Sequence, residues 1–261
     1  RIDRSVQIAR TVLTTENPAT IAKQLAETTA DAVIVYTQES PLIEQAIAAL
    51  HARGIPVVTM ISDLPSTRRL AYAGTDHYAA GRTAAYFMAN MVRSPGPMLV
   101  LCNHFGFQSH EQRVRGFTDG LRHYAPGLSV TEVIEGGDDS SLSEKLLRKA
   151  FKKHGRLAGF YNVGAANDAC GAALREGLLT ERPLFIGHEL THETRPMLQD
   201  GTMALAIDQN PEHQARFAID VLLHHFGYAA HTWLKPPYAS NVSFRLFSPE
   251  NMVTFSAPAS G

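Results

Sequence analysis

Short apolar runs alternate with helical segments along almost the whole chain, and this alternation limits the possible folds more than any other feature. The runs are rich in Val, Ile and Leu and mostly lack polar alternation, which is typical of strands buried on both faces. Strands that alternate with helices predict a parallel sheet covered by helices. We expect strands at residues 6–13, 32–36, 56–61, 70–73, 98–102, 130–134, 159–161, 184–186 and 203–207.

The segments between these runs carry the residues that start and stop helices. Ser40 precedes Pro41 as a capping residue, and Gly54 and Gly177 each follow a helical segment as a stop residue. Because about nine strands are expected and no low-complexity linker divides them, two sheets are favoured over one broad sheet. The predicted fold class is α/β, with two doubly wound parallel-sheet lobes.

The composition narrows the classes of function. The 261 residues include 24 Lys and Arg and 25 Asp and Glu, so the chain lacks the positive charge that nucleic-acid binding requires. Its two cysteines, Cys102 and Cys170, form no C-x-x-C pair, which fits a reduced compartment. No apolar run reaches the length of a membrane span, and no signal peptide opens the sequence. We therefore expect a cytoplasmic protein.

The run HELTH at residues 188–192 matches the H-E-x-x-H signature of zinc proteases. That chemistry needs both histidines on one face of a helix, with the glutamate beside them as general base. Here the run follows PLFIG at residues 183–187, which predicts a buried strand and its exit turn. If Thr191 caps the next helix, His188 and His192 do not share a helical face. We expect neither a metal site nor catalytic residues here.

Polar residues follow almost every expected strand. Ligands of doubly wound sheets bind outside the carboxyl ends of the strands, so these loops are the place to look for a site. A polar ligand needs hydrogen-bonding groups at fixed positions and a ring to stack on, and the loops contain both. The alternative is that the loops are polar simply because they lie at the surface. They are residues 37–39, 62–63, 103–105, 162–164, 188–189 and 208–209.

Several short segments form an ordered series along the chain. They are GIPVVT at 54–59, GTDHYAAGR at 74–82, HEQRVRGF at 110–117, GHELT at 187–191 and AIDQNP at 206–211. In this order they resemble segments of the effector-binding domain of lac repressor family transcriptional regulators, namely G-I-P-V-V, D-N-x-x-x-G, R-x-x-G-F, G-x-D and Q-x-P. Periplasmic sugar-binding proteins share that architecture. His77 and Glu189 depart from the pattern, because they replace the usual Asn and Asp.

The resemblance spans roughly residues 5–250 and implies a type I periplasmic binding protein-like fold. One lobe would hold residues 1–74 and 209–240, and the other residues 75–208 and 241–254. Residues 6–13 correspond to the family's second strand, so the first strand of that lobe is missing. The family's DNA-binding helix-turn-helix is expected upstream and is absent here. A homodimer would pair two such heads on a two-fold operator.

Ligand contacts follow from the resemblance and from the strand-end rule. Arg113 is the expected clamp, in the first turn of a helix capped by Ser109, because a planar guanidinium suits vicinal hydroxyls or a carboxylate. Asp63 and Glu189 would accept hydrogen bonds from hydroxyl groups, although Asp63 could equally form a turn. Gln209 lies where the chain should cross between lobes. The strand-end loops add His104, Phe105 and Asn162, although Phe105 could equally belong to the core.

These features predict a binding domain without enzymatic chemistry. The expected function is the ligand-sensing domain of a DNA-binding transcriptional regulator, which binds a small polar effector, a sugar, in the interlobe cleft. Its partners would be the effector, operator DNA through the missing domain and a second copy, with no cofactor and no membrane. The alternative is the periplasmic sugar-binding component of a transporter. An enzyme is disfavoured because no strand precedes a G-x-G-x-x-G run and neither a P-loop nor a G-x-S-x-G run is present.

Overall fold

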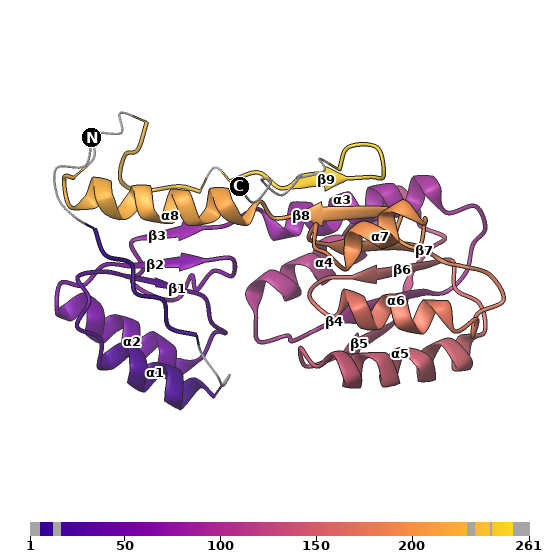
Figure 1. Ribbon diagram of the computed structural model, residues 1–261, viewed down its shortest axis with the longest axis horizontal. Coiled ribbons are helices and arrows are strands. Elements are labelled where there is room, and N and C mark those ends of the chain that lie inside the picture. The colour runs from indigo at the N-terminus through magenta and orange to yellow at the C-terminus, as the bar shows by residue number, and fades with distance from the viewer. Residues whose placement is uncertain (1–5, 13–16, 229–232, 241, 253–261) are drawn as a thin grey trace, which may run out of the picture. The chain divides into compact units, whose positions relative to one another are not determined.

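A computed structural model describes residues 6–12, 17–228, 233–240 and 242–252, which fall into two compact units (Figure 1). The first unit consists of residues 1–76, 106–111 and 209–243. The second consists of residues 77–105, 112–208 and 244–261. The expected division placed residues 106–111 in the second lobe. In the structure they group with the first unit, where Phe107 stacks on Tyr36 with ring centroids 4.9 Å apart.

The first unit is built on a three-stranded parallel sheet in the order β1-β2-β3. Figure 1 shows α1 and α2 on one side of this sheet and α8 on the other. Ile43, Ile47 and Leu50 of α2 are completely buried in the core on the α2 side. The strands are β1 (Val33–Val35), β2 (Val57–Met60) and β3 (Ala71–Ala73). The helices are α1 (Pro18–Ala26), α2 (Pro41–Ala52) and α8 (Pro211–His225).

The second unit contains a six-stranded sheet in the order β5-β4-β6-β7-β8-β9. Its strands are parallel except β9, which runs antiparallel to β8. The strands are β4 (Met98–Cys102), β5 (Val130–Glu135), β6 (Gly159–Asn162), β7 (Leu184–His188), β8 (Leu205–Asp208) and β9 (Arg245–Phe247). The helices are α3 (His77–Met91), α4 (Gln108–Tyr124), α5 (Ser140–His154), α6 (Asn167–Arg175) and α7 (Thr194–Gln199), of which α4 begins in the first unit.

Both faces of the larger sheet are buried. Along β4, Leu99 and Leu101 belong to one hydrophobic cluster, whereas Val100 and Cys102 belong to the other. Successive side chains of a strand point to opposite faces, so a strand covered on both sides has no polar positions to alternate with. This confirms the α/β fold with predominantly parallel sheets that the apolar runs predicted.

One predicted strand is absent from the described part of the chain, and one observed strand was not predicted. Residues 6–12 lie in no strand, and Leu13 lies outside the described residues. Among the described residues the small sheet consists of β1, β2 and β3, and residues 6–12 add no strand to it, so their backbone groups form no sheet hydrogen bonds. Conversely, β9 was not expected, because a three-residue strand at a sheet edge carries little local signal.

The helix boundaries follow local signals in most places. Ser40 caps α2, and its hydroxyl accepts a hydrogen bond from the Ile43 amide at 3.3 Å. Gly54 and Gly177 take φ values of +74° and +66° after helices, as stop residues do. Ser109 does not cap α4, because the helix begins earlier, at Gln108.

No helix within the described ranges is long and apolar enough to cross a membrane.

The two cysteines are expected to be unreactive in the folded protein. Burial raises the pKa of Cys102 to about 12, helped by the nearby Glu135 carboxylate, and burial raises the pKa of Cys170 well above its ordinary value. Because the thiolate is the reactive form, iodoacetamide at about pH 8 should modify neither thiol natively and both after unfolding in guanidinium. Mass spectrometry of the intact protein measures this, and rapid native alkylation of either cysteine would contradict it.

Candidate functional site

The order of strands in the second unit marks one edge of its sheet as the place for a ligand. β4 pairs with β5 on one side and with β6 on the other, so the chain moves in one direction from β4 to β5 and then crosses back past β4 to β6. Ligands of such sheets bind at the carboxyl ends of the strands where this reversal occurs. The loops at that point begin at Asn103 after β4 and at Val163 after β6.

Arg113 lies at this edge with its guanidinium bound by two neighbouring elements. It is only 2% exposed. Its Nε and Nη2 lie 3.2 and 3.1 Å from Nδ1 of His77, the first residue of α3. Its Nη1 donates to the carbonyl of Val163, directly after β6, at 2.6 Å. Arg113 therefore sits in the second turn of α4, not in its first, and joins α3, α4 and the end of β6.

Two glycines allow α3 and α4 to approach each other closely beside Arg113. A Cβ atom on Gly81 of α3 would lie 2.2 Å from the carbonyl oxygen of Arg113. A Cβ atom on Gly116 of α4 would lie 2.2 Å from the carbonyl oxygen of Tyr78. Any larger residue would push the helix backbones apart, so these glycines fix where Arg113 stands relative to His77.

A chain of buried hydrogen bonds connects the ends of β6 and β7. The Tyr161 hydroxyl lies 2.8 Å from Nε2 of His188, and burial raises the pKa of Tyr161. The Asn162 side-chain amide donates to Oδ1 of Asn167 at 2.9 Å, and the Asn167 side-chain amide donates to the His188 backbone carbonyl at 3.0 Å. Asn162 is thus held by protein groups, and its contact with a ligand stays a prediction.

The HELTH run begins at the last residue of β7 and does not form a helix. His188 ends β7 and is buried, whereas the His192 side chain is 90% exposed, so the prediction that the two histidines share no helical face is confirmed. Thr191 is not the helix cap, because α7 begins at Thr194 after Glu193. The Thr191 hydroxyl instead accepts hydrogen bonds from the amides of those two residues. Within the described part of the chain, no group of three or more His, Cys, Asp and Glu residues could hold a metal.

The other predicted residues of the second unit are at least partly accessible. Phe105 is 43% exposed, and its amide donates to Oε1 of Glu135 at 3.2 Å. His104 is half-buried beside it, after β4. Glu189, also half-buried, follows β7 with a φ of +68°, in the left-handed region. These three residues present a ring and polar groups at the carboxyl ends of β4 and β7.

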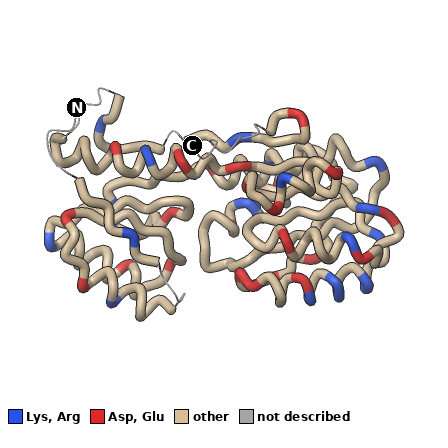
Figure 2. Tube along the Cα trace, in the orientation of Figure 1, with Lys and Arg blue, Asp and Glu red and all other residues tan. Residues whose placement is uncertain are grey.

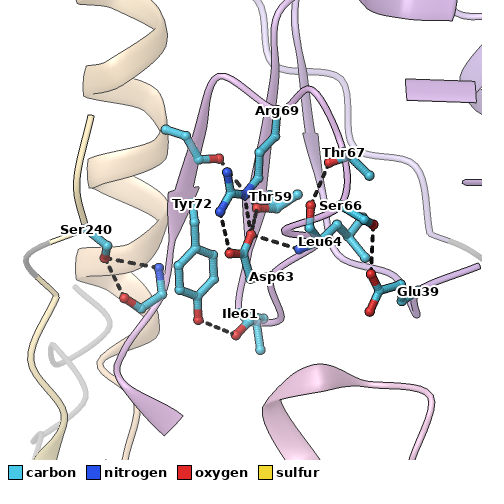
Figure 3. A network of polar contacts seen from close by, with 12 residues as sticks. Glu39, Thr59, Ile61, Asp63, Leu64, Ser66, Thr67, Arg69, Tyr72 and Ser240 are labelled. Carbon is cyan, nitrogen blue, oxygen red and sulfur yellow. Dashed lines mark hydrogen bonds and ion pairs between the residues drawn. The ribbon is translucent and has the colours of Figure 1, made fainter. Parts of the chain in front are cut away.

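Asp63 and Gln209 belong to the first unit. The Asp63 carboxylate accepts hydrogen bonds from the Thr59 hydroxyl and the Leu64 amide, both at 2.8 Å, and forms an ion pair with Arg69 (Figure 3). The turn-forming alternative therefore describes its observed contacts, and a ligand contact stays a prediction. Gln209 is half-buried, and its backbone carbonyl accepts a hydrogen bond from the side-chain amide of Gln214 at 2.8 Å.

The Asp63–Arg69 pair is expected to stabilise the protein measurably. The two side chains are 13% and 25% exposed, and their hydrogen bond raises the pKa of Arg69. Arg69→Met should lower the free energy of unfolding by about 2 kcal/mol, because it leaves a partly buried carboxylate without its cation. Urea unfolding measures the loss.

The matched control is Lys23→Met, which removes an ion pair with Glu27. The Lys23 side chain is 74% exposed, and that of Glu27 is 66% exposed. It should cost less than about 0.5 kcal/mol. Equal effects of the two substitutions would contradict the stabilising role of the Asp63–Arg69 pair.

The loop after β5 was not among the expected site loops, although it lies beside β4. Burial raises the pKa of Asp138, while the neighbouring Asn103 amide and His104 partly oppose that shift. Asn103 itself is completely buried. The run GGDD at residues 136–139, directly after a strand, is the sequence signal that could have drawn attention to this loop.

The distribution of charged residues does not indicate which unit holds the site. Both basic and acidic residues are present throughout each unit (Figure 2). The candidate site is therefore defined by strand ends, buried hydrogen bonds and one exposed ring.

Comparison with solved structures finds sugar-binding proteins of similar fold. A solute-binding protein of an ABC transporter from Burkholderia graminis, solved in complex with D-arabinose, has a TM-score of 0.81 and 22% identity over 91% of this chain and 82% of that chain. A glucose-galactose binding protein, GanP, from Geobacillus stearothermophilus has a TM-score of 0.78 and 23% identity, covering 90% and 82%.

A solute-binding protein from Agrobacterium vitis with bound D-fucose has a TM-score of 0.81 and 19% identity, covering 96% and 89%. No curated protein matches the sequence. Identities this low establish the shared fold alone. A family model described as a periplasmic binding protein domain matches residues 9–228, well over half of the sequence, and the chain therefore belongs to the periplasmic binding protein domain family.

Proposed function

We propose that this chain is the sugar-binding domain of a solute-binding protein that delivers its ligand to a transporter. The observation that carries the proposal is the set of polar groups and the exposed ring at the carboxyl ends of β4 and β7, in a fold shared with sugar-binding proteins. Sugars present hydroxyl groups for such hydrogen bonds and an apolar face for an aromatic ring.

The transporter interpretation takes the place of the regulatory one as the leading hypothesis. The solved structures named above belong to sugar-binding proteins, two of them described as solute-binding proteins of ABC transporters. Nothing in the comparisons supports operator DNA, a homodimer or a lac repressor family regulator. A cytoplasmic location also lacks support, because one structural neighbour, from Hahella chejuensis, is described as the periplasmic component of a sugar transport system.

The chemistry of four proposed contact residues suggests the role of each in binding a sugar. Phe105 would stack on the apolar face of the sugar, and His104 would donate or accept a hydrogen bond at the ring edge. Glu189 would accept from hydroxyl groups, and Arg113 would donate to them. The remaining proposed contacts are Asn162, Asp63 and Gln209.

A thermal-shift screen tests the proposal. D-arabinose, D-fucose, D-glucose and D-galactose are added separately, with the acyclic polyol sorbitol as a control. A ligand at about 100 times its Kd adds about 2.7 kcal/mol to the folded state, so at least one sugar should raise the melting temperature well above the sorbitol control. If none of the four does, the sugar-binding proposal is wrong.

Phe105→Ala should weaken binding of the selected sugar roughly tenfold while leaving stability nearly unchanged, since the ring is 43% exposed. Tyr124→Ala is the matched control, because that ring is 41% exposed but lies at the opposite end of α4 from Phe105. Isothermal titration calorimetry measures both affinities. Equal affinity of Phe105→Ala and the parent would remove Phe105 from the site.

A further inference from the structure

We propose that His77 is the positioning residue for Arg113. In this proposal a neutral imidazole, protonated on Nε2, holds the guanidinium in one orientation at the carboxyl ends of the strands. His77 would orient Arg113 whether or not a ligand is bound, and the role of this orientation in sugar binding rests on the function proposed above.

The contact between the two side chains dictates the tautomer of the histidine. A guanidinium donates hydrogen bonds and accepts none, and both Nε and Nη2 of Arg113 approach the same atom, Nδ1 of His77, at 3.2 and 3.1 Å. Nδ1 must therefore present its lone pair. In a neutral ring the proton then resides on Nε2.

The surroundings oppose the doubly protonated form of the ring. His77 and Arg113 are each 2% exposed, so water screens their interaction poorly. A proton on Nδ1 would place a second positive charge against the guanidinium and would break both hydrogen bonds. The neutral Nε2–H tautomer is the form that keeps the observed contacts.

Contacts on two edges fix the plane of the guanidinium. His77 holds the edge formed by Nε and Nη2, and the Val163 carbonyl holds Nη1 at 2.6 Å. The guanidinium is a rigid planar fork, so acceptors on two edges determine its orientation, whereas a single acceptor would allow it to pivot. Because Val163 follows β6 directly, this places the group at the ligand-binding edge of the sheet.

Two substitutions separate hydrogen bonding from packing. In His77→Asn, the amide oxygen occupies the place of Nδ1, one bond beyond Cγ, and can accept from the guanidinium. In His77→Leu, a side chain of comparable branching has no acceptor. A purely structural histidine would be replaced about equally well, or equally badly, by either residue.

Nuclear magnetic resonance tests the positioning role without any ligand. Long-range ¹H–¹⁵N spectra at pH 7 should show His77, assigned by its loss in His77→Asn, as the neutral Nε2–H tautomer. The Arg113 Hε signal should exchange slowly with water in the parent and in His77→Asn, and rapidly in His77→Leu. A charged ring, the Nδ1–H tautomer, or slow Hε exchange in His77→Leu would overturn the proposal. If His77→Leu does not fold, the parent and His77→Asn spectra still decide it.

Calorimetry with D-arabinose and D-fucose then tests the link to binding. His77→Leu should bind the tighter of the two sugars at least about tenfold more weakly than the parent, and His77→Asn within about threefold of it. Parental affinity in His77→Leu would overturn the role in binding. If neither these sugars nor the others of the panel bind the parent, the proposed function and the binding role fail together, while the spectra still report whether His77 orients Arg113.

Discussion

Gly81→Ala is expected to lower the free energy of unfolding by about 3 kcal/mol, although alanine is the better helix former. The added Cβ would lie 2.2 Å from the Arg113 carbonyl oxygen and 2.9 Å from the Phe117 amide nitrogen. Both are backbone atoms of α4, so neither can rotate away and the whole helix must shift. Gly116→Ala should have a similar effect, since its Cβ would lie 2.2 Å from the Tyr78 carbonyl oxygen of α3.

Gly127→Ala provides the matched control for both substitutions. A Cβ atom there meets no atom within 4 Å, and the residue is exposed in the turn after α4. Its effect should stay within about 0.5 kcal/mol. Urea unfolding of the three variants and the parent measures the differences. A loss below about 1 kcal/mol for Gly81→Ala would mean that α3 and α4 do not approach as closely as the structure has them.

These glycines explain part of what made the sequence recognisable. Gly81 ends the D-x-x-x-x-G pattern of residues 76–81, and Gly116 lies in the R-x-x-G-F pattern of residues 113–117. The two patterns meet across the contact of α3 and α4, so each encodes a close backbone approach. The sequence alone shows that glycines recur at these positions, but it cannot show that they face one another across two helices.

Strands were predictable where their signal is local. β4 lies at residues 98–102, as expected, because an unbroken apolar run is the direct consequence of burial on both faces. Residues 6–12 were also expected to form a strand, although polar residues interrupt this segment; they join no strand among the described residues, and Val6, Ile8 and Val12 are 46%, 72% and 66% exposed. Whether an apolar segment becomes a strand depends on a neighbour that can lie anywhere in the chain, and no local pattern contains that information.

The candidate site also has features that were predictable from the sequence and features that were not. The rule that ligands lie at strand ends selected residues such as His104 and Glu189, which the structure places after β4 and β7. The side chains that bind the predicted site residues were not predictable from the sequence. Asp63 pairs with Arg69 across a turn, and Asn162 with Asn167 across a loop, because those bonds depend on side-chain directions that only the folded chain defines.

Arg113→Ala is expected to cost about 3 kcal/mol of stability and to weaken sugar binding by roughly tenfold or more. The sequence predicted a large effect on binding and a small one on folding. The structure adds the loss of stability, because truncation leaves two buried acceptors, Nδ1 of His77 and the Val163 carbonyl, without this donor, and leaves a void where the side chain was. Urea unfolding gives the first quantity, and calorimetry with the sugar selected by thermal shift gives the second.

Arg115→Ala is the internal control, two residues along the same helix. Arg115 is exposed and packs over the Tyr78 ring at 5.3 Å from the ring centre, a contact that contributes about 0.5–1 kcal/mol at an exposed site. Its removal should cost no more than that and leave sugar affinity unchanged. A loss of stability in Arg113→Ala with parental affinity would make Arg113 a purely structural cation and would end its assignment as a ligand contact. A larger loss of affinity for Arg115→Ala would mean that the ligand approaches the opposite face of α4, and that the strand ends around β4 and β6 are not the binding site.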